Sequence, residues 1–198
     1  MVRLIDFAER LFVVLISIPF LMAFVAAMPS HPQVILVAIS EMLAVGLILT
    51  RKPGAIAATP YAFLIAILGT ALPLFVRPAD GSALISPWLT STLMSGGLAI
   101  SISAKLFLNR SFGIVAANRG VKSGGPYRVV RHPMYLGYIT TQIGFLLANF
   151  TLPNLLLYAG AWALQVLRIR EEEGILAKDD LYAAYSQRVR WRLLPGVY

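Results

Sequence analysis

The chain has 198 residues, of which 58% are hydrophobic and only 13% charged, and its mean hydropathy is +0.75. Soluble domains carry about 25% charged residues, so the composition excludes a disordered chain and disfavours a water-soluble globule. Cysteine is absent, which excludes disulfides, thiolate-bound zinc, iron–sulfur clusters and a cysteine nucleophile. With only two histidines in the chain, we predict no metal site.

Uncharged runs divide the sequence into predicted helices. A helix needs roughly 20 mainly apolar residues to cross a bilayer. In chain order, the sequence predicts membrane-spanning helices at 10–28, 33–50, 59–76 and 88–107. The uncharged stretch 132–167 is long enough for two shorter helices, 133–150 and 154–168, joined by a turn at 151–154 that contains Pro and Asn.

The predicted fold class is therefore all-α: a polytopic integral membrane protein with about five to six transmembrane helices, including a C-terminal helical hairpin. Each helix of this hairpin would be about 25 Å long. That length leaves open whether the hairpin crosses the bilayer fully or is partly re-entrant.

The positions of the basic residues predict the topology. Of the 17 Lys and Arg residues, 16 fall in the N-terminal tail, the loop near 51–58, the stretch 105–132 and the C-terminal tail, and only Arg77 falls in the alternate connections. By the positive-inside rule, both termini and the basic stretches face the cytosol. The membrane would be the plasma membrane, or inner membrane, if the chain is bacterial. Anionic membrane lipids then account for the net charge of +8, and no nucleic-acid partner is predicted.

The composition changes near residue 105. Residues 1–104 are predicted N-terminal transmembrane helices with short loops, whereas 105–198 contain 12 of the 17 basic residues. We expect one integrated domain with its chemistry in 105–198, formed by a basic loop, the helical hairpin and a cytosolic C-terminal segment.

Two features of the predicted spans bear on how the helices pack. Small residues recur every four positions on the fourth span, at Ser91, Ser95, Ala99 and Ser103, and this spacing predicts close helix packing. Glu41 is the only acid in an early span. It indicates either a functional intramembrane site or a structural partner of the fourth span.

A glycine-rich basic stretch leads into the hairpin. Gly120, Gly124 and Gly125 give a flexible backbone, and Pro133 suits the first turn of a helix because its missing N–H is not needed there. The same proline pushes His132 out of the helical conformation. Because a helix N-terminus attracts anions, this segment predicts either an anion site or a basic loop that contacts lipid phosphates.

Acidic residues follow the second hairpin helix, where residues 168–176 read RIREEEGIL. Arg168, Glu172 and Leu176 are four apart, so they share one helix face. Acids are unfavourable at a helix C-terminus. The pattern therefore indicates either a solvated continuation of the helix or a carboxylate site for a cation, opposite the basic loop.

These two blocks have a recognisable spacing. Residues 125–137 read GPYRVVRHPMYLG, and 168–176 are followed by Tyr182 and Tyr185. They resemble the GPYxxxRHPxYxG motif and the RIxxEExxL block with two tyrosines of the isoprenylcysteine carboxyl methyltransferase family. The resemblance covers about residues 105–198, and the wider superfamily includes phospholipid N-methyltransferases.

The resemblance implies a multi-span membrane enzyme that uses S-adenosylmethionine, bound at the cytosolic ends of the last helices. By position, the residues that match its cofactor contacts are Arg119, Gly120, Val121, Lys122, Tyr127, His132, Pro133, Met134, Tyr135 and Glu172. Arg168 matches an arginine beside the reactive group of the acceptor. Both Arg168 and Glu173 are catalytic candidates, Glu173 as the base for an amine acceptor.

The sequence thus predicts an S-adenosylmethionine-dependent methyltransferase acting on a lipidic or small hydrophobic acceptor. A carboxylate acceptor would pair with Arg168 and need no base. A phospholipid amine would favour acidic residues, which are also present. A non-catalytic membrane scaffold that retains the fold is the third alternative.

Overall fold

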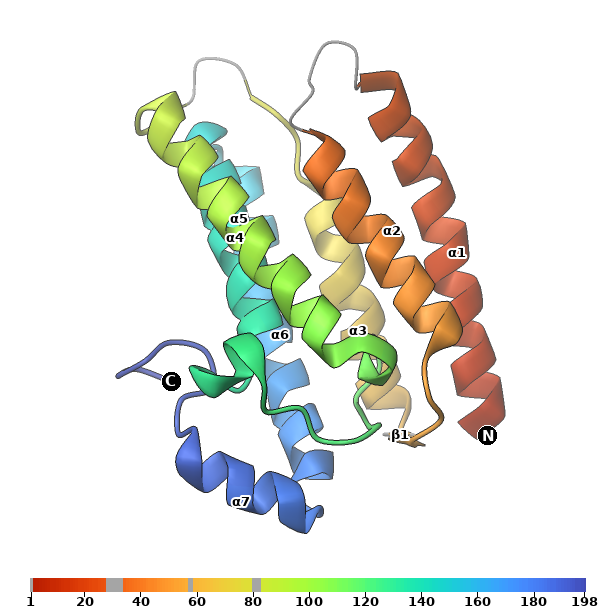
Figure 1. The fold of residues 1–198 in the computed structure, drawn as a ribbon. Helices are drawn as coiled ribbons and strands as arrows, with labels where there is room; N and C mark the ends of the chain where they lie inside the picture. The colour runs from red at the N-terminus through yellow and green to blue at the C-terminus, as the bar shows by residue number, and fades with distance from the viewer. Residues whose placement is uncertain (1, 28–33, 57–58, 80–82) are drawn as a thin grey trace.

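The computed structural model describes residues 2–27, 34–56, 59–79 and 83–198. Within these ranges the chain forms seven α-helices, most of them packed side by side in a bundle (Figure 1). In chain order they are α1 (Val2–Ala27), α2 (Val34–Thr50), α3 (Pro60–Ala71), α4 (Pro87–Leu108), α5 (Pro133–Ala148), α6 (Leu152–Leu176) and α7 (Asp180–Arg188). The short elements are the 3-10 helices η1 (Leu72–Phe75), η2 (Asn109–Ser111) and η3 (Gly125–Arg128), and an antiparallel pair of strands, β1 (Ala55–Ile56) and β2 (Ala117–Asn118).

The helices lie where the uncharged runs predict them, which confirms the all-α class. Two helices are longer than expected: α1 begins at Val2, and α6 continues to Leu176. The predicted connection at 29–32 lies outside the described residues.

The predicted turn at 151–154 is wrong, because α6 already begins at Leu152. The Thr151 side chain caps this helix by accepting a hydrogen bond of 3.2 Å from the Asn154 backbone N–H. Pro153 fits the first turn for the same reason that Pro133 fits the start of α5. The chain therefore reverses direction at 149–151.

Helices α4 and α5 approach each other closely at two glycines. A Cβ atom on Gly97 would lie 2.5 Å from the backbone nitrogen of Thr141. One on Gly137 would lie 2.6 Å from the carbonyl oxygen of Gly97. The missing side chains let the two backbones touch.

The prediction that the small residues spaced four apart on α4 form its packing face is therefore wrong, because α4 packs on α5 through a different face. Ser91, Ser95 and Ala99 are exposed on the chain, whereas the buried positions of α4 are Thr90, Gly97, Ser101, Ala104 and Lys105. The contact with α5 uses Gly97, which has no Cβ atom, and Ser101, whose side chain lies opposite Gly137.

Glu41 has a structural partner on α4. The fully buried Lys105 places its Nζ 4.0 Å from Glu41 Oε1 and donates a hydrogen bond of 2.8 Å to Ser40 Oγ. A buried charge needs such partners. The geometry favours the structural role for Glu41 over an intramembrane functional site.

Apolar side chains cover much of the outside of the bundle. Within the described residues, one helical segment, Pro87–Ser111, is long and apolar enough to cross a membrane, and only 28% of its apolar window is buried. Exposed apolar side chains also follow one face of α1, at Phe7, Leu11, Leu15, Ile18 and Met22. Exposed apolar surface of this extent is unusual in a soluble monomer, while the number of membrane spans stays a prediction.

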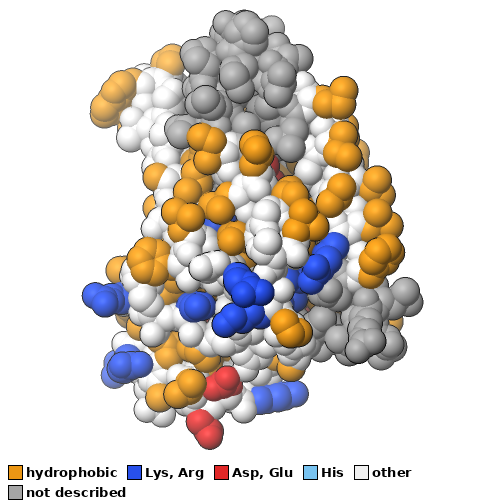
Figure 2. Space-filling view, turned by 45° about the vertical axis from the view of Figure 1, so that its right-hand side comes forward, with side chains coloured by type: hydrophobic (Ala, Val, Ile, Leu, Met, Phe, Trp, Pro, Cys, Tyr) orange, Lys and Arg blue, Asp and Glu red, His pale blue; other side chains and the backbone are white. Residues whose placement is uncertain are grey.

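The charged segments gather at one end of the bundle. The N-terminus, β1, the segment before α5, α7 and the C-terminus all lie in the lower part of Figure 1. Figure 2 shows Lys and Arg side chains over the lower half of one face, with mainly hydrophobic side chains above them. The segments that carry the motifs are thus brought to the same end.

Replacing Gly97 by alanine tests the helix contact. We expect Gly97→Ala to lower the free energy of unfolding by about 1–3 kcal/mol, because the new methyl group overlaps α5. Gly96 is the matched control, since a Cβ atom there meets nothing within 4 Å. Thermal unfolding in detergent measures both variants, and equal behaviour of the two would contradict this packing.

Candidate active site

An open cleft lies at the charged end of the bundle, among the segment 111–122, the ends of α4 and α6, and α7. It holds about 690 Å³ of space outside the atoms, its open mouth included. Small and apolar residues form part of its surface, among them Gly113, Val115, Ala116 and Ala117.

Long-range backbone contacts hold the wall formed by 111–122. Strand β2 in this wall pairs with β1 from the connection after α2. The Lys52 backbone N–H donates to the Arg110 carbonyl at 2.8 Å, and Arg110 Nε donates to the Thr50 carbonyl at 2.8 Å. Gly54 permits the approach, because a Cβ atom there would lie 2.3 Å from the Asn118 carbonyl oxygen.

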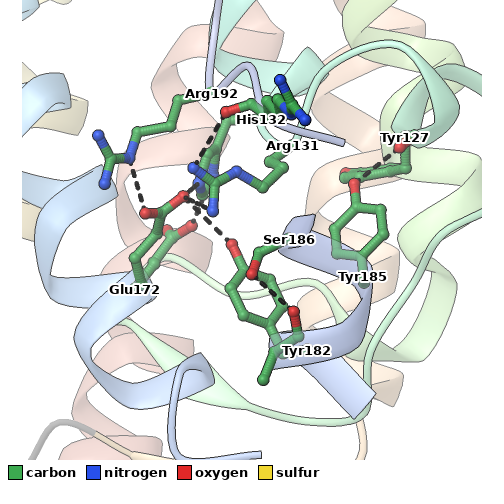
Figure 3. A network of polar contacts seen from close by, with 11 residues as sticks. Tyr127, Arg131, His132, Glu172, Tyr182, Tyr185, Ser186 and Arg192 are labelled. Atoms are coloured by element: carbon green, nitrogen blue, oxygen red, sulfur yellow. Dashed lines mark hydrogen bonds and ion pairs between the residues drawn. The ribbon is translucent and has the colours of Figure 1, made fainter. Parts of the chain in front are cut away.

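Aromatic residues close the opposite side of the cleft. Tyr127 comes from η3, and Tyr182 and Tyr185 come from α7. The Tyr185 hydroxyl donates a hydrogen bond of 2.7 Å to the Tyr127 carbonyl (Figure 3). This bond fixes α7 against the basic loop, and burial raises the pKa of the Tyr185 hydroxyl to about 12, so it stays protonated and able to donate.

Glu173 joins four segments at the end of α6, beyond the predicted span 154–168. Its Oε1 lies 3.1 Å from His132 Nε2 and 3.3 Å from Arg131 Nη1. The Tyr182 hydroxyl donates to the same oxygen at 3.2 Å, and Arg192 Nε donates to Oε2 at 2.7 Å. Figure 3 shows Arg131, His132 and Arg192 converging on this end of the helix.

These contacts determine the charge state of the cluster. Burial raises the pKa of the Glu173 carboxyl, but hydrogen bonds from His132 and Arg192 outweigh it and lower the pKa to about 2. Burial lowers the pKa of the His132 imidazole, but hydrogen bonds to Glu172 and Glu173 outweigh it and raise the pKa above its ordinary value of 6.5. An imidazolium between two carboxylates is the favoured state.

Glu172 occupies the adjacent position and faces the cleft. The Tyr135 hydroxyl donates a short hydrogen bond to its Oε1, and His132 Nδ1 lies 3.6 Å from its Oε2. Both partners are buried behind the cleft surface, while Glu172 itself lines the cleft. His132 and Tyr135 therefore orient a carboxylate that is presented to the cavity.

Arg168 lies one helical turn before Glu172 and is buried between α3, α5 and α6. Its Nη2 donates to the Ile114 carbonyl at 2.9 Å, and its guanidinium lies 5.2 Å from the centre of the Tyr135 ring. Its Nε is buried without a hydrogen-bond partner. Among the described residues, no carboxylate lies within ion-pair distance of Arg168.

The structure brings most of the predicted cofactor residues to one surface. The predicted residues that line the cleft are Arg119, Gly120, Val121, Lys122, Tyr127, Met134 and Glu172. His132, Pro133 and Tyr135 are buried behind it. Of the two catalytic candidates, neither Arg168 nor Glu173 is on the cleft surface.

Several cleft residues were not predicted. Leu108, Ser111 and the small residues of the 113–117 segment belong to no motif, and Arg131 belongs to the first motif but was not among the predicted cofactor residues. The contact from Arg192 to Glu173 was also missed. Sequence periodicity carries no signal for these positions, because the segment before β2 is irregular and Arg192 is distant in the chain.

Comparison with known families supplies the reaction class. Residues 98–178 match the model of the isoprenylcysteine carboxyl methyltransferase (ICMT) family. This segment is similar to the ICMT family. The match confirms the resemblance predicted from the two motifs and indicates a methyltransferase. No curated protein is similar enough to the chain to count as a match.

The Glu173 cluster predicts how the stability of the protein changes with pH. Because the folded pKa of Glu173 is about 2 and its ordinary value is 4.5, its carboxylate stabilises the fold fully above the ordinary value. This contribution is lost as the pH falls toward the folded value. We expect Glu173→Gln to cost about 2 kcal/mol near neutral pH, because a charged hydrogen-bond acceptor is lost.

The measurement is the thermal unfolding midpoint of wild type and variant across the acidic range. The difference between them should shrink as the pH falls below about 4. Glu171→Gln is the control, since Glu171 is the neighbouring acid on α6 and takes no part in the cluster. A difference that is constant with pH would contradict the ionised state of Glu173.

Proposed function

We propose that the chain is a membrane-embedded, S-adenosylmethionine-dependent methyltransferase that methylates a carboxylate on a lipidic or small hydrophobic acceptor. One observation carries the proposal: Arg168 and Glu172 lie one turn apart on α6, and Tyr135 contacts both side chains. A cation without a carboxylate partner thus adjoins an oriented carboxylate that lines the cleft. These are suitable groups for binding an anionic acceptor beside a cationic methyl donor.

The chemistry of the cleft fits the methyl donor. S-adenosylmethionine, when bound, supplies an electrophilic methyl group on a sulfonium. Glu172 is suited to its ammonium or its ribose hydroxyls, and Arg131 and Lys122 to its carboxylate. Tyr127 offers an aromatic face to a cation. The small residues of the 113–117 segment leave room for a flat base.

His132, Pro133 and Tyr135 then act from behind the cleft. His132 and Tyr135 keep Glu172 ionised and oriented, and Pro133 starts α5 so that Met134 reaches the cleft surface. In this assignment Glu173 is a positioning residue, since its contacts hold the basic loop, α7 and the C-terminal tail against α6.

The state of Glu173 favours a carboxylate acceptor over an amine. An amine needs a base to remove its proton. Glu173 has a pKa of about 2 and four polar partners, which makes it a poor base. A carboxylate is already ionised at neutral pH, so Arg168 needs only to bind and orient it.

The membrane is the proposed medium for both the protein and its acceptor. The apolar outer faces of α1 and α4 suit lipid contact. The basic segments gathered at one end suit anionic headgroups on the cytosolic side. A cleft at that end can receive a water-soluble donor from the cytosol and an apolar acceptor from the bilayer.

Two substitutions on α6 separate donor binding from acceptor use. We expect Glu172→Ala to weaken S-adenosylmethionine binding at least tenfold, or about 1.4 kcal/mol. We expect Arg168→Ala to abolish methyl transfer but to leave donor affinity within about threefold, or roughly 0.7 kcal/mol. Arg168→Lys should also transfer poorly, because a point charge cannot hold a carboxylate in a fork.

Calorimetry measures donor binding, and transfer of a labelled methyl group to a membrane lipid extract measures turnover. Arg170→Ala is the control on the same helix, since Arg170 is exposed. Loss of donor binding in Arg168→Ala would move Arg168 into the donor site. Unchanged donor binding in Glu172→Ala would refute the donor site and favour a non-catalytic scaffold.

Single cysteines test the membrane orientation, because the native chain has none. Ser86, before α4, and Gln187, in α7, are both exposed and lie toward opposite ends of the bundle. A membrane-impermeant thiol reagent added to intact cells should label the Ser86→Cys variant. It should label the Gln187→Cys variant only after the cells are opened, and the reverse pattern would overturn the proposed cytosolic site.

A further inference from the structure

A buried acid on α1 holds the wall of the cleft from outside the ICMT-family segment. The Glu9 side chain is fully buried. Its Oε1 accepts a hydrogen bond of 2.6 Å from the Ile114 backbone N–H and one of 3.2 Å from the Val115 backbone N–H. Arg51, at the end of α2, donates to the same oxygen at 2.5 Å.

The segment that Glu9 binds contacts both the proposed donor cleft and the proposed acceptor residue, Arg168. Val115 and its neighbours Gly113, Ala116 and Ala117 line the cleft. The Ile114 carbonyl accepts the hydrogen bond from Arg168. Ile114 therefore links the two residues: its N–H group donates to Glu9, and its carbonyl group accepts from Arg168.

Local structure does not account for the position of this segment. Residues 112–116 lie between η2 and β2, outside any helix or strand, yet Phe112, Ile114, Val115 and Ala116 are buried. Buried amide groups need partners, and losing one costs about 1–3 kcal/mol. The Glu9 carboxylate supplies an acceptor for two consecutive amides, and Arg51 offsets the cost of burying its charge.

We propose that Glu9 is a positioning residue for methyl transfer: through Ile114 and Val115 it fixes the donor wall of the cleft and the guanidinium of Arg168. This inference rests on the proposed function. Helix α1 would then position residues of the cleft in addition to packing in the bundle.

The contact geometry provides a test that separates positioning from stability. All three contacts use Oε1, while Oε2 is buried without a hydrogen-bond partner. Glu9→Gln therefore keeps an acceptor oxygen in place. In the double variant Glu9→Met with Arg51→Met, the acceptor is lost and neither charge is left alone, and such apolar replacement of a buried ion pair is often neutral or stabilising.

We expect the double methionine variant to unfold near the wild-type temperature, because removal of the buried ion pair offsets the loss of the acceptor for the Ile114 and Val115 amides. It should nevertheless bind S-adenosylmethionine at least fivefold more weakly, by calorimetry in detergent. Glu9→Gln should bind it within about threefold of wild type, or roughly 0.7 kcal/mol. The control is Glu41→Gln, which removes another acid of the bundle with a lysine partner and no contact to residues 112–116. It should leave donor affinity unchanged.

Amide hydrogen exchange of peptides that cover 112–117 provides a readout independent of activity. Exchange should accelerate in the double methionine variant and stay unchanged in Glu41→Gln. If the wild type does not bind S-adenosylmethionine, the proposed function fails, while faster exchange still supports the tether. An exchange rate equal to that of the wild type in the double methionine variant would overturn the positioning role, and so would a donor affinity equal to that of the wild type. The role would also be overturned if the variant bound the donor weakly only because its unfolding temperature had fallen.

Discussion

The site depends on one carboxylate, Glu173, at which separate parts of the C-terminal half are joined. Four donors reach it from the basic loop, α7 and the C-terminal tail. A carboxylate at the end of a helix is unfavourable by itself because of the helix dipole. Surrounding cations reverse this cost, so the basic loop and the acidic helix end stabilise each other only when both are folded together.

The division of roles between adjacent acids follows from this arrangement. Consecutive helix residues point about 100° apart, so Glu172 and Glu173 cannot face the same surroundings. Glu173 faces the loop and tail and is fully occupied, whereas Glu172 reaches the cleft with Tyr135 and His132 behind it. A structural anchor and a side chain that faces the cleft therefore occupy neighbouring positions in the second motif block.

Buried charge connects the two halves of the chain. Glu9 pairs with Arg51 and accepts hydrogen bonds from the segment before β2, and Glu41 lies beside Lys105 on α4. In an apolar bundle each charged side chain needs a partner nearby, so these pairs fix how the N-terminal helices fit against the segment that matches the ICMT family. In the proposed membrane setting, apolar contacts alone would allow the helices to slide or rotate at little cost, because lipid is as apolar as the helix surfaces.

Local signals in the sequence predicted the helices, the methyltransferase class and part of the residues that line the cleft. Apolar runs, Pro133 as a helix start and the two motif blocks are local signals, and each can be recognised without knowing what packs against it. Tertiary structure alone decided that Glu9 reaches Ile114, that Arg192 reaches Glu173, and that Gly97 rather than the serine stripe faces α5. These contacts join residues far apart in the chain, and only the packed arrangement of the helices brings such residues within hydrogen-bond or van der Waals distance.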